Sequence, residues 1–241
     1  MIRTAFIILY VVPATAVLGI IAIIVSFFTR SGNTVHIIAR IWAKSILTVS
    51  GIDVSVSGLS NIDPGRSYIF MSNHRSNFDI PVLLGCLPVQ FRWLAKAELF
   101  KIPIFGRAMS GAGYVKIDRF NRASAIKSID QVAAKMKNGV SVMIFPEGTR
   151  SEDGHVKPFK KGGFVMAVDS QVPIVPVILQ GTRSIMSKGS WLISPGSVRM
   201  FIEEPIVTRG YTRQTKDDLI DGVRSVICQV FEKGTKFDKK T

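Results

Sequence analysis

An uncharged stretch at the amino terminus limits what this chain can fold into more than any other feature. Residues 4–29 include no Asp, Glu, Lys or Arg and consist mainly of Ile, Val, Leu, Ala and Phe. As an α-helix the stretch would be about 39 Å long, whereas the hydrocarbon core of a bilayer is about 30 Å thick. The stretch therefore predicts a helix that enters or crosses a membrane. A helix buried inside a soluble domain is disfavoured because the apolar run has no interruption.

A cleaved signal peptide is the competing interpretation of the same residues. Met1-Ile2-Arg3 resembles the basic start of such a peptide, and Ala14-Thr15-Ala16 has the form of a cleavage site. The apolar run nevertheless continues through residues 17–28, which a mature soluble protein would not carry at its new terminus. We therefore predict that the segment is retained.

Residues 33–49 predict a second, amphipathic helix, whose apolar side includes Val35, Ile38, Trp42 and Ile46. An apolar face with Trp and a few basic residues suits the membrane interface. The two segments form either a helical hairpin in one leaflet, bent at Pro13 or Gly19, or one span followed by a surface helix. In both cases residues 1–50 are the expected membrane anchor and residues 51–241 an α/β domain. If the first helix spans, the Lys and Arg that follow it place this domain on the cytoplasmic side, in a bacterium the cytoplasmic face of the inner membrane.

The charge balance predicts an anionic partner. The chain has 31 Lys and Arg against 17 Asp and Glu, a formal net charge of +14. Because the basic residues are scattered and no nucleic-acid-binding motif occurs, we favour a membrane surface over nucleic acid. The two cysteines, Cys86 and Cys228, form no metal-spaced pair and indicate no disulfide framework, which suits a reducing compartment.

Beyond residue 50, apolar strands alternate with helices. This order is typical of an α/β fold in which helices flank a mixed, mostly parallel sheet. The predicted strands are 52–56, 68–71, 89–94, 113–117, 140–145, 174–179 and 198–202, and the predicted helices are 78–86, 96–109 (interrupted), 123–137, 164–169 and one that begins near Thr215.

One short stretch, Asn73-His74-Arg75-Ser76-Asn77-Phe78-Asp79, lies between a predicted strand and a predicted helix. His74 should occupy the turn and Asp79 the first turn of the helix, which brings the carboxylate within reach of the imidazole. An Asp bonded to one ring nitrogen fixes the tautomer and leaves the other nitrogen as a general base. Because no Ser or Cys nucleophile with its own signature lies nearby, the base would act on a substrate hydroxyl.

Two further polar turns follow predicted strands, and the ends of parallel strands gather at one edge of a sheet. One turn carries Asp118 and Arg119, and the other carries Glu147, Gly148, Thr149 and Arg150. Arginine forks make paired hydrogen bonds to phosphate. With Lys96 at another strand end, these residues predict a site for a phosphate-bearing alcohol, in which Gly148 supplies a tight turn and no chemistry.

These motifs, in this order and spacing, resemble the glycerolipid acyltransferases typified by 1-acylglycerol-3-phosphate acyltransferase. The resemblance covers residues 35–205, with Lys116 as a departure where the family usually has an aromatic or aliphatic residue. The segments that carry it are Asn73-His74-x-Ser76-x-x-Asp79, Lys96-x-Glu98-Leu99, Gly113-x-x-x-Ile117-Asp118-Arg119, Phe145-Pro146-Glu147-Gly148-Thr149-Arg150-Ser151 and Val175-Pro176-Val177.

The resemblance implies a reaction and roles for the motif residues. His74, oriented by Asp79, would deprotonate the 2-hydroxyl of lysophosphatidic acid, which then attacks a thioester of coenzyme A or acyl carrier protein to give phosphatidic acid. Arg119 and Arg150, with Lys96, would hold the phosphate, and Glu147 would order the loop or contact the glycerol. No cofactor is expected beyond the acyl-CoA or acyl-ACP co-substrate. The motifs do not single out the oxyanion donor; backbone amides at the start of the helix after His74 are one candidate.

Two alternatives remain open. The acceptor could be another lysolipid, such as a lyso-ornithine lipid or a lysophospholipid. An acceptor with a neutral head group would need Arg119 and Arg150 less. The chain could instead be a non-catalytic protein that binds anionic lipid, although this leaves His74 and Asp79 without a purpose. His36 and His155 have no metal-ligand spacing, so no metal site is expected, and we predict structural or solvated roles for both.

Overall fold

The computed structural model describes residues 1–29, 31–118, 128–133, 136, 139–151 and 155–237, with side chains described up to residue 233. Its centre is one sheet with the strand order β1-β7-β6-β2-β5-β3-β4. Every recorded neighbour pair is parallel except β6 and β7, so the predicted mixed, mostly parallel sheet is confirmed. The strands are β1 (Ile52–Ser57), β2 (Ile69–Ser72), β3 (Phe91–Lys96), β4 (Val115–Ile117), β5 (Ser141–Ile144), β6 (Ile174–Gln180) and β7 (Gly196–Ile202).

The central strands are buried on both faces, which explains their nearly continuous apolar sequences. Successive side chains of a strand point to opposite faces of the sheet. In β2, Phe70 enters one hydrophobic core, whereas Ile69 and Met71 enter the other. In β5, Met143 joins Phe70 while Val142 joins Ile69. The sheet therefore separates two cores and needs helices on both faces.

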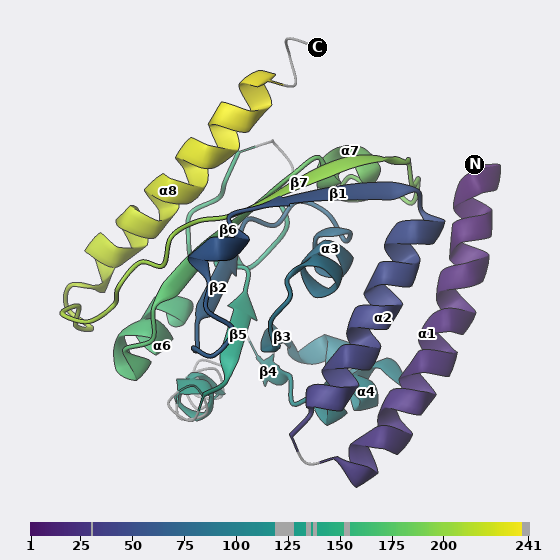
Figure 1. Ribbon diagram of the computed structural model, residues 1–241, viewed down its shortest axis with the longest axis horizontal. Helices are drawn as coiled ribbons and strands as arrows, with labels where there is room; N and C mark the ends of the chain where they lie inside the picture. Colours follow the sequence, from purple (N-terminus) through teal and green to yellow (C-terminus); the bar gives the residue numbers. More distant parts are fainter. Residues whose placement is uncertain (30, 119–127, 134–135, 137–138, 152–154, 238–241) are drawn as a thin grey trace.

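Figure 1 shows these helices as two layers. On one face, α3 (Asp79–Cys86) lies next to the sheet, and α2 (Asn33–Val49), α1 (Ile2–Phe28) and α4 (Phe105–Gly111) lie on the outer side of α3. The other layer includes α6 (Gly162–Ser170) and α8 (Lys216–Phe237). In the predicted helix at 123–137, residues 128–133 and 136 are helical, and the remaining residues lie outside the described chain. The remaining short elements are η1 (Leu59–Asn61), η2 (Ala97–Lys101) and α7 (Thr182–Ile185).

Most of the apolar stripe of α2 packs against protein, although the sequence suits the membrane interface. Val35 and Ile46 are buried, and Ile46 belongs to the core beneath the sheet. The exposed apolar residues of α2 are Val49 at the end of the stripe and Ile37 and Ile41 on another side of the helix. An apolar stripe seeks either hydrocarbon or a protein core, and the close packing of α2 against α3 supplies the core.

Two arginines connect α2 and the residues just before it with β3 and the segment that precedes β3. Arg40 on α2 donates to the carbonyls of Leu87 and Val89, both at 2.8 Å. Arg92 on β3 donates to the Ser31 carbonyl at 2.9 Å and to the Asn33 side chain. Both guanidinium groups donate to backbone carbonyls of the other segment, so these hydrogen bonds hold the amino-terminal helices against the α/β domain.

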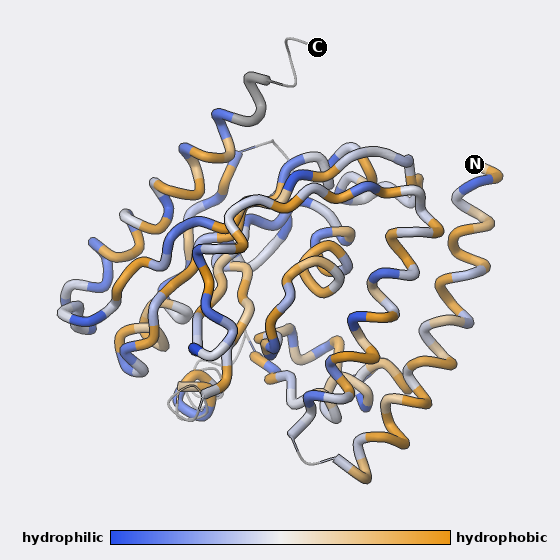
Figure 2. The backbone as a smooth tube through the Cα atoms, viewed as in Figure 1, coloured by the Kyte–Doolittle hydropathy of each residue, from blue (hydrophilic) through white to orange (hydrophobic). Residues whose placement is uncertain are grey.

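One helix among the described residues, α1, is long and apolar enough to cross a membrane. Figure 2 shows hydrophobic residues along its whole length, and most of its large side chains are exposed. Its inner side nevertheless packs against α2 and α4. The contacts extend from Thr4, which accepts a hydrogen bond from the Ile193 amide at 3.1 Å, to Ser26 beside Gly111. The helix therefore lies along the domain from end to end.

Candidate active site

The turn that carries His74 and the turn that carries Glu147 meet because β2 and β5 are parallel neighbours. Met71 pairs with Ile144, so both strands end at the same edge of the sheet. Directly beyond this edge β2 leads to His74, and β5 leads to Phe145 and Glu147. This is the edge at which α/β sheets bind their ligands.

His74 and Asp79 are in direct contact, as their spacing predicts. The Nδ1 atom of His74 is 2.8 Å from Oδ2 of Asp79. The same oxygen accepts hydrogen bonds from the amides of Arg75, at 2.6 Å, and Ser76, at 2.8 Å. Asp79 is completely buried, and three donors converge on one of its oxygens. The carboxylate is therefore fixed, and it fixes the imidazole.

This contact determines which ring nitrogen is available. With Nδ1–H donating to a carboxylate, Nε2 carries the lone pair. Within the described chain no protein group bonds to Nε2, and the side chain of His74 is 16% exposed. A substrate hydroxyl can therefore reach Nε2, whereas the carboxylate is out of its reach.

Glu147 holds the backbone on which His74 sits. Its Oε1 accepts from the His74 amide and its Oε2 from the Lys157 amide, both at 2.8 Å. The Ser151 amide donates to the His74 carbonyl at 2.9 Å, so the turn of residues 147–151 forms hydrogen bonds with both polar groups of the His74 backbone. Burial is the main cause that raises the pKa of the Glu147 carboxyl, and the nearby Asp79 charge acts in the same direction.

An aromatic stack connects the histidine with the protein interior. The imidazole of His74 lies flat on Phe145, with 3.8 Å between ring centroids and 10° between planes. Phe145 in turn contacts Trp93, at 5.3 Å between centroids. The ring of His74 is thereby held on one face by apolar carbon and at its edge by Asp79.

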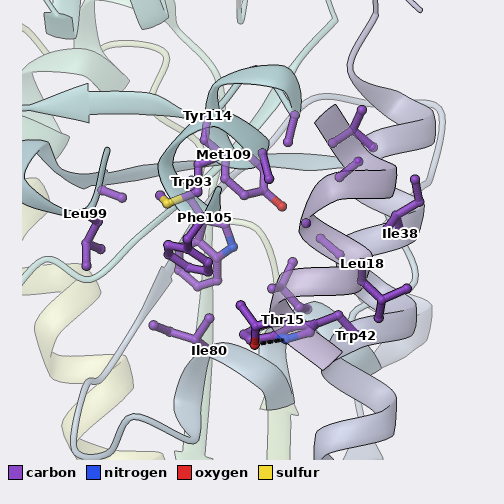
Figure 3. A pocket seen from close by; sticks show the side chains of 18 residues that line it. Thr15, Leu18, Ile38, Trp42, Ile80, Trp93, Leu99, Phe105, Met109 and Tyr114 are labelled. Atoms are coloured by element: carbon purple, nitrogen blue, oxygen red, sulfur yellow. Dashed lines mark hydrogen bonds between the residues drawn. The ribbon is translucent and has the colours of Figure 1, made fainter. Parts of the chain in front are cut away.

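Trp93 also lines an apolar pocket that begins beside the turn of residues 73–79. Ile80, the residue after Asp79, is part of its wall. In Figure 3 Ile80, Thr15 and Trp42 lie at one end of the pocket, and Met109 and Tyr114 lie at the other. Thr15 accepts a hydrogen bond from the Trp42 indole at 2.9 Å, which joins α1 to α2 at the first end. The other wall residues are Leu18, Gly19, Ala22, Val35, Ile38, Ala39, Leu84, Ala95, Leu99, Phe105, Ala108 and Ala112.

The other predicted site residues lie along the same edge at different distances. Gly148 has a φ of +75°, which favours glycine, and it closes the turn by donating to the Phe145 carbonyl. Thr149 is exposed and Arg150 half-buried, both beyond β5. Lys96 is exposed at the end of β3. Because β3 is two strands from β2 in the sheet, this end lies roughly 10 Å from the end of β2. Arg119 lies outside the described residues, and Asp118 before it follows the edge strand β4.

Backbone amides around the start of α3 already have acceptors. Those of Arg75 and Ser76 donate to Asp79, and that of Phe78 donates to the Ser76 hydroxyl at 3.1 Å. The amides of Asp79 and Ile80 donate to carbonyls within the same turn. The turn thus uses these donors to hold the carboxylate and to begin the helix.

Two supporting residues were not predicted from the sequence. Asn73 is buried and exchanges two hydrogen bonds with the backbone of Leu179, at 2.9 and 2.8 Å, which joins the start of the turn to β6. The Ser76 hydroxyl donates to the Met186 carbonyl at 2.7 Å. Both residues belong to the first motif, but their partners lie more than 100 positions away along the chain.

The fold and the site together define an α/β protein with a long apolar amino-terminal helix and a histidine–carboxylate pair beside an apolar pocket. The chain belongs to the acyltransferase family, whose sequence model matches residues 53–180. This confirms the resemblance that the sequence motifs indicate.

Individual relatives agree with this assignment. The chain is 39% identical over 173 residues to the chloroplastic 1-acyl-sn-glycerol-3-phosphate acyltransferase BAT2 of Brassica napus, covering 71% of this chain and 50% of the relative. It is 34% identical over 195 residues to the human 1-acyl-sn-glycerol-3-phosphate acyltransferase alpha, covering 80% and 69%. The chain thus spans about half the length of the chloroplast relatives that it matches.

A solved structure resembles almost the whole molecule. It is the crystal structure of the 1-acyl-sn-glycerophosphate (LPA) acyltransferase PlsC from Thermotoga maritima. The TM-score is 0.83 at 30% sequence identity, and the match covers 97% of this chain and 95% of the other. The agreement therefore includes the amino-terminal helices as well as the sheet.

Proposed function

We propose that this protein transfers an acyl chain from a thioester of coenzyme A or acyl carrier protein to the 2-hydroxyl of 1-acylglycerol-3-phosphate. The product is phosphatidic acid. The observation that carries the proposal is the contact between His74 and Asp79 at the carboxyl edge of the sheet, with Nε2 left open to a substrate. The relatives named for this reaction support the same acceptor.

In the proposed reaction Nε2 of His74 takes the proton of the acceptor hydroxyl as its oxygen attacks the thioester carbonyl. A tetrahedral oxyanion forms and then collapses, which breaks the carbon–sulfur bond. The thiolate leaves and receives the proton from His74, so the enzyme returns to its starting state. A positioned base of this kind contributes roughly 10²–10⁴-fold to the rate.

The groups around His74 serve this proton transfer. Asp79 holds the tautomer and stabilises the imidazolium that forms while the proton is on Nε2. Glu147 accepts its hydrogen bond from the backbone amide of His74, and this bond fixes the position of the His74 backbone at the sheet edge. Glu147 is therefore a positioning residue.

Basic residues of the neighbouring turns suit the acceptor phosphate. Arg150 lies on the turn that grips His74, and its guanidinium fork is the group that binds phosphate most specifically. Lys96 is the last residue of β3, farther along the same edge, and Arg119 is two residues beyond the end of β4 in the sequence. We propose that Arg150 and Arg119 hold the phosphate and that Lys96 adds positive charge.

The apolar pocket is the proposed place of an acyl chain. It begins at Ile80, beside Asp79, and its walls come from α1, α2, α3, α4 and β3. In this arrangement the carboxyl end of the chain would lie toward Ile80, the lining residue next to Asp79 in the sequence. Because α1 forms one wall while its outer side is exposed and apolar, a chain can pass from the leaflet into the pocket without crossing water.

The packing of α1 favours a position within one leaflet. A helix of 27 residues is about 40 Å long and could span a bilayer. Here, however, α1 contacts the domain from Thr4 to Ser26. A perpendicular span would carry α2, α4 and the polar residues beside them into hydrocarbon, which is costly. We propose that the exposed side of α1 rests in the leaflet that holds the lipid substrates.

The test of the acceptor uses detergent-purified protein with 1-acylglycerol-3-phosphate and each thioester carrier. We expect phosphatidic acid to form with at least one carrier. Transfer to a lysolipid without a phosphate group, in the absence of transfer to 1-acylglycerol-3-phosphate, would contradict the proposal.

A charge variant tests how the acceptor is held. Arg150→Gln should raise KM for 1-acylglycerol-3-phosphate about tenfold, because a hydrogen bond to a charged group contributes about 1.5–3 kcal/mol. Arg209→Gln removes an exposed arginine far along the chain and should leave KM unchanged. Equal KM values in both variants would remove Arg150 from the phosphate site.

A further inference from the structure

The loop of residues 187–195, between α7 and β7, is hydrogen-bonded to the amino-terminal end of α1. The amide of Ile193 donates to the Thr4 hydroxyl at 3.1 Å, and the amide of Ser194 donates to the Ile185 carbonyl at 2.9 Å. Pro195 and the Arg3 side chain both lie next to Gly51. Figure 1 shows the connection between α7 and β7 on the side of the molecule where α1 begins.

The tip of this loop presents two large apolar side chains to the outside. Trp191 is 78% exposed and Leu192 is 55% exposed, whereas Ile193 turns inward and packs on the core. The tip is held by its own hydrogen bonds: Ser190 donates to the Ser187 carbonyl at 3.1 Å, and Leu192 donates to the Ser190 hydroxyl at 3.1 Å. The exposure of Trp191 therefore belongs to a bonded turn and not to a loose end.

An exposed Trp–Leu pair suits a bilayer better than water. Trp has a large apolar ring and one N–H donor, and it concentrates at the level of lipid head groups. The first residues of α1 are exposed and apolar beside the loop, namely Met1, Ile2 and Phe6. The tip thus continues the apolar side of α1, and the net charge of +14 favours an anionic lipid surface over a second, equally basic copy of the chain.

The base of the loop is bonded to both turns of the active site. Met186, just before the loop, accepts a hydrogen bond from the Ser76 hydroxyl at 2.7 Å. Lys188 Nζ lies 3.5 Å from the Arg150 carbonyl. A contact made by the tip would therefore set the position of the His74 turn relative to the lipid surface.

We propose that the 187–195 loop is a second lipid-inserting element, with Trp191 and Leu192 at its tip, and that it enters the same leaflet as α1. The proposal concerns lipid contact and does not depend on acyl transfer. The protein then has two points of insertion, one along α1 and one at the loop, and the two together fix the orientation of the site.

The test measures lipid contact of Trp191 directly, in full-length protein reconstituted into vesicles of anionic lipid and brominated phosphatidylcholine. Bromine quenches indole fluorescence only at contact distance. Emission of Trp191 is obtained as the difference between the wild type and Trp191→Phe, in which Trp42 and Trp93 still emit and report that the fold is intact. We expect the Trp191 emission to fall at least twofold relative to vesicles without bromine.

A matched reporter controls for unspecific quenching. Val207 is also exposed and apolar, but it follows Ile206, which pairs with Ile174 at the amino end of β6, away from the site. In the Trp191→Phe background, Val207→Trp should be quenched by aqueous acrylamide and not by brominated lipid. If Trp191 shows the same behaviour, the proposal is wrong. It is equally wrong if Trp191 is shielded from both quenchers in a way that depends on protein concentration, which would indicate a second copy.

A kinetic readout separates this proposal from the proposed function. The double variant Trp191→Ser, Leu192→Ser should lose about threefold to tenfold of its activity toward acceptor embedded in vesicles and keep its activity in detergent micelles. Equal loss in both media would contradict a role in orientation. If the wild type transfers no acyl chain at all, the fluorescence result still stands by itself.

Discussion

Two histidines in this molecule have opposite surroundings. His74 lies at the open edge of the sheet, and its Nδ1 contacts a carboxylate at 2.8 Å. His36 is completely buried on α2, and its Nδ1 contacts the Tyr114 hydroxyl at 3.0 Å. Tyr114 lines the end of the apolar pocket opposite Ile80, so the pocket extends from the region of one histidine to that of the other.

The charges around the two rings differ as much as their exposure. Asp79 supports a positive charge on His74, whereas the neighbours of His36 are Arg92 and Arg40. Burial and the charges of these two arginines lower the pKa of His36 to about 3. His36 is therefore neutral across the physiological range and cannot exchange a proton there. A histidine ring nitrogen alone does not make a base at neutral pH; a carboxylate partner and access for a substrate are needed as well.

The largest expected effect among the supporting residues is at Asp79. Asp79→Asn keeps the shape but removes the charge that stabilises the imidazolium, so turnover should fall at least about 100-fold. The measurement is kcat in detergent, with Asp53→Asn on an exposed position of β1 as the matched control. A loss below threefold would mean that Asp79 only fills space.

Glu147→Gln should have a smaller effect, a loss of about tenfold in kcat. The amide group of Gln would place its own donor against the amide of either His74 or Lys157, which shifts the turn without removing the base. Because burial raises the pKa of the Glu147 carboxyl, the wild type should lose this positioning on the acid side at a higher pH than an exposed glutamate would allow.

The ratio of wild-type to Glu147→Gln activity, measured from about pH 7 to about pH 5, checks this dependence. The ratio should decrease as the pH falls, because protonation makes the wild type resemble the variant. A constant ratio would contradict a positioning role for the ionised carboxylate.

His36 should affect stability and not turnover. Its folded pKa lies below its unfolded value of 6.5, so the unfolded chain takes up a proton as the pH falls from 6.5 toward 3 while the folded chain does not. Over this window His36 should lower the free energy of unfolding by up to about 1.4 kcal/mol per pH unit.

His36→Leu should remove that part of the acid sensitivity. Denaturant unfolding of wild type and variant at several pH values gives the comparison. We expect the variant to be about 1–3 kcal/mol less stable near neutral pH, because the Tyr114 hydroxyl loses its partner, but to have the shallower pH dependence. Parallel pH profiles would refute the account of His36.

The smallest expected effect is that of Tyr114→Phe. It removes one hydroxyl and one hydrogen bond, which should cost about 1 kcal/mol of stability and change turnover less than about twofold. Thermal unfolding and kcat, measured on the same preparation, check both values. A loss of turnover as large as that of Asp79→Asn would make the His36 region part of the catalytic machinery.

Local features of the sequence were sufficient for the contact between His74 and Asp79, because five positions across a strand–helix turn leave little freedom. The alternation of apolar strands and helices was likewise sufficient for the fold class. The grip of Glu147 and Ser151 on the His74 backbone depends on β2 and β5 being neighbours, and strand order is not visible in one sequence.

The apolar stripe of α2 shows a different limit. A stripe made of Val35, Trp42 and Ile46 is equally suited to lipid and to a protein core, so only the packing decides between them. The expected oxyanion donors show a related limit. Amides at the start of the helix look available in the sequence, but those of Phe78, Asp79 and Ile80 already donate to acceptors within the turn.

The most direct test of the account compares the two histidines in one assay. Acyl transfer to 1-acylglycerol-3-phosphate is measured for the wild type, His74→Ala and His36→Leu, each purified in the same detergent and checked for folding. The account predicts that His74→Ala loses roughly 10²–10⁴-fold in kcat while His36→Leu stays within about threefold of the wild type. A folded His74→Ala variant with near-normal turnover would contradict the central claim that His74 is the base.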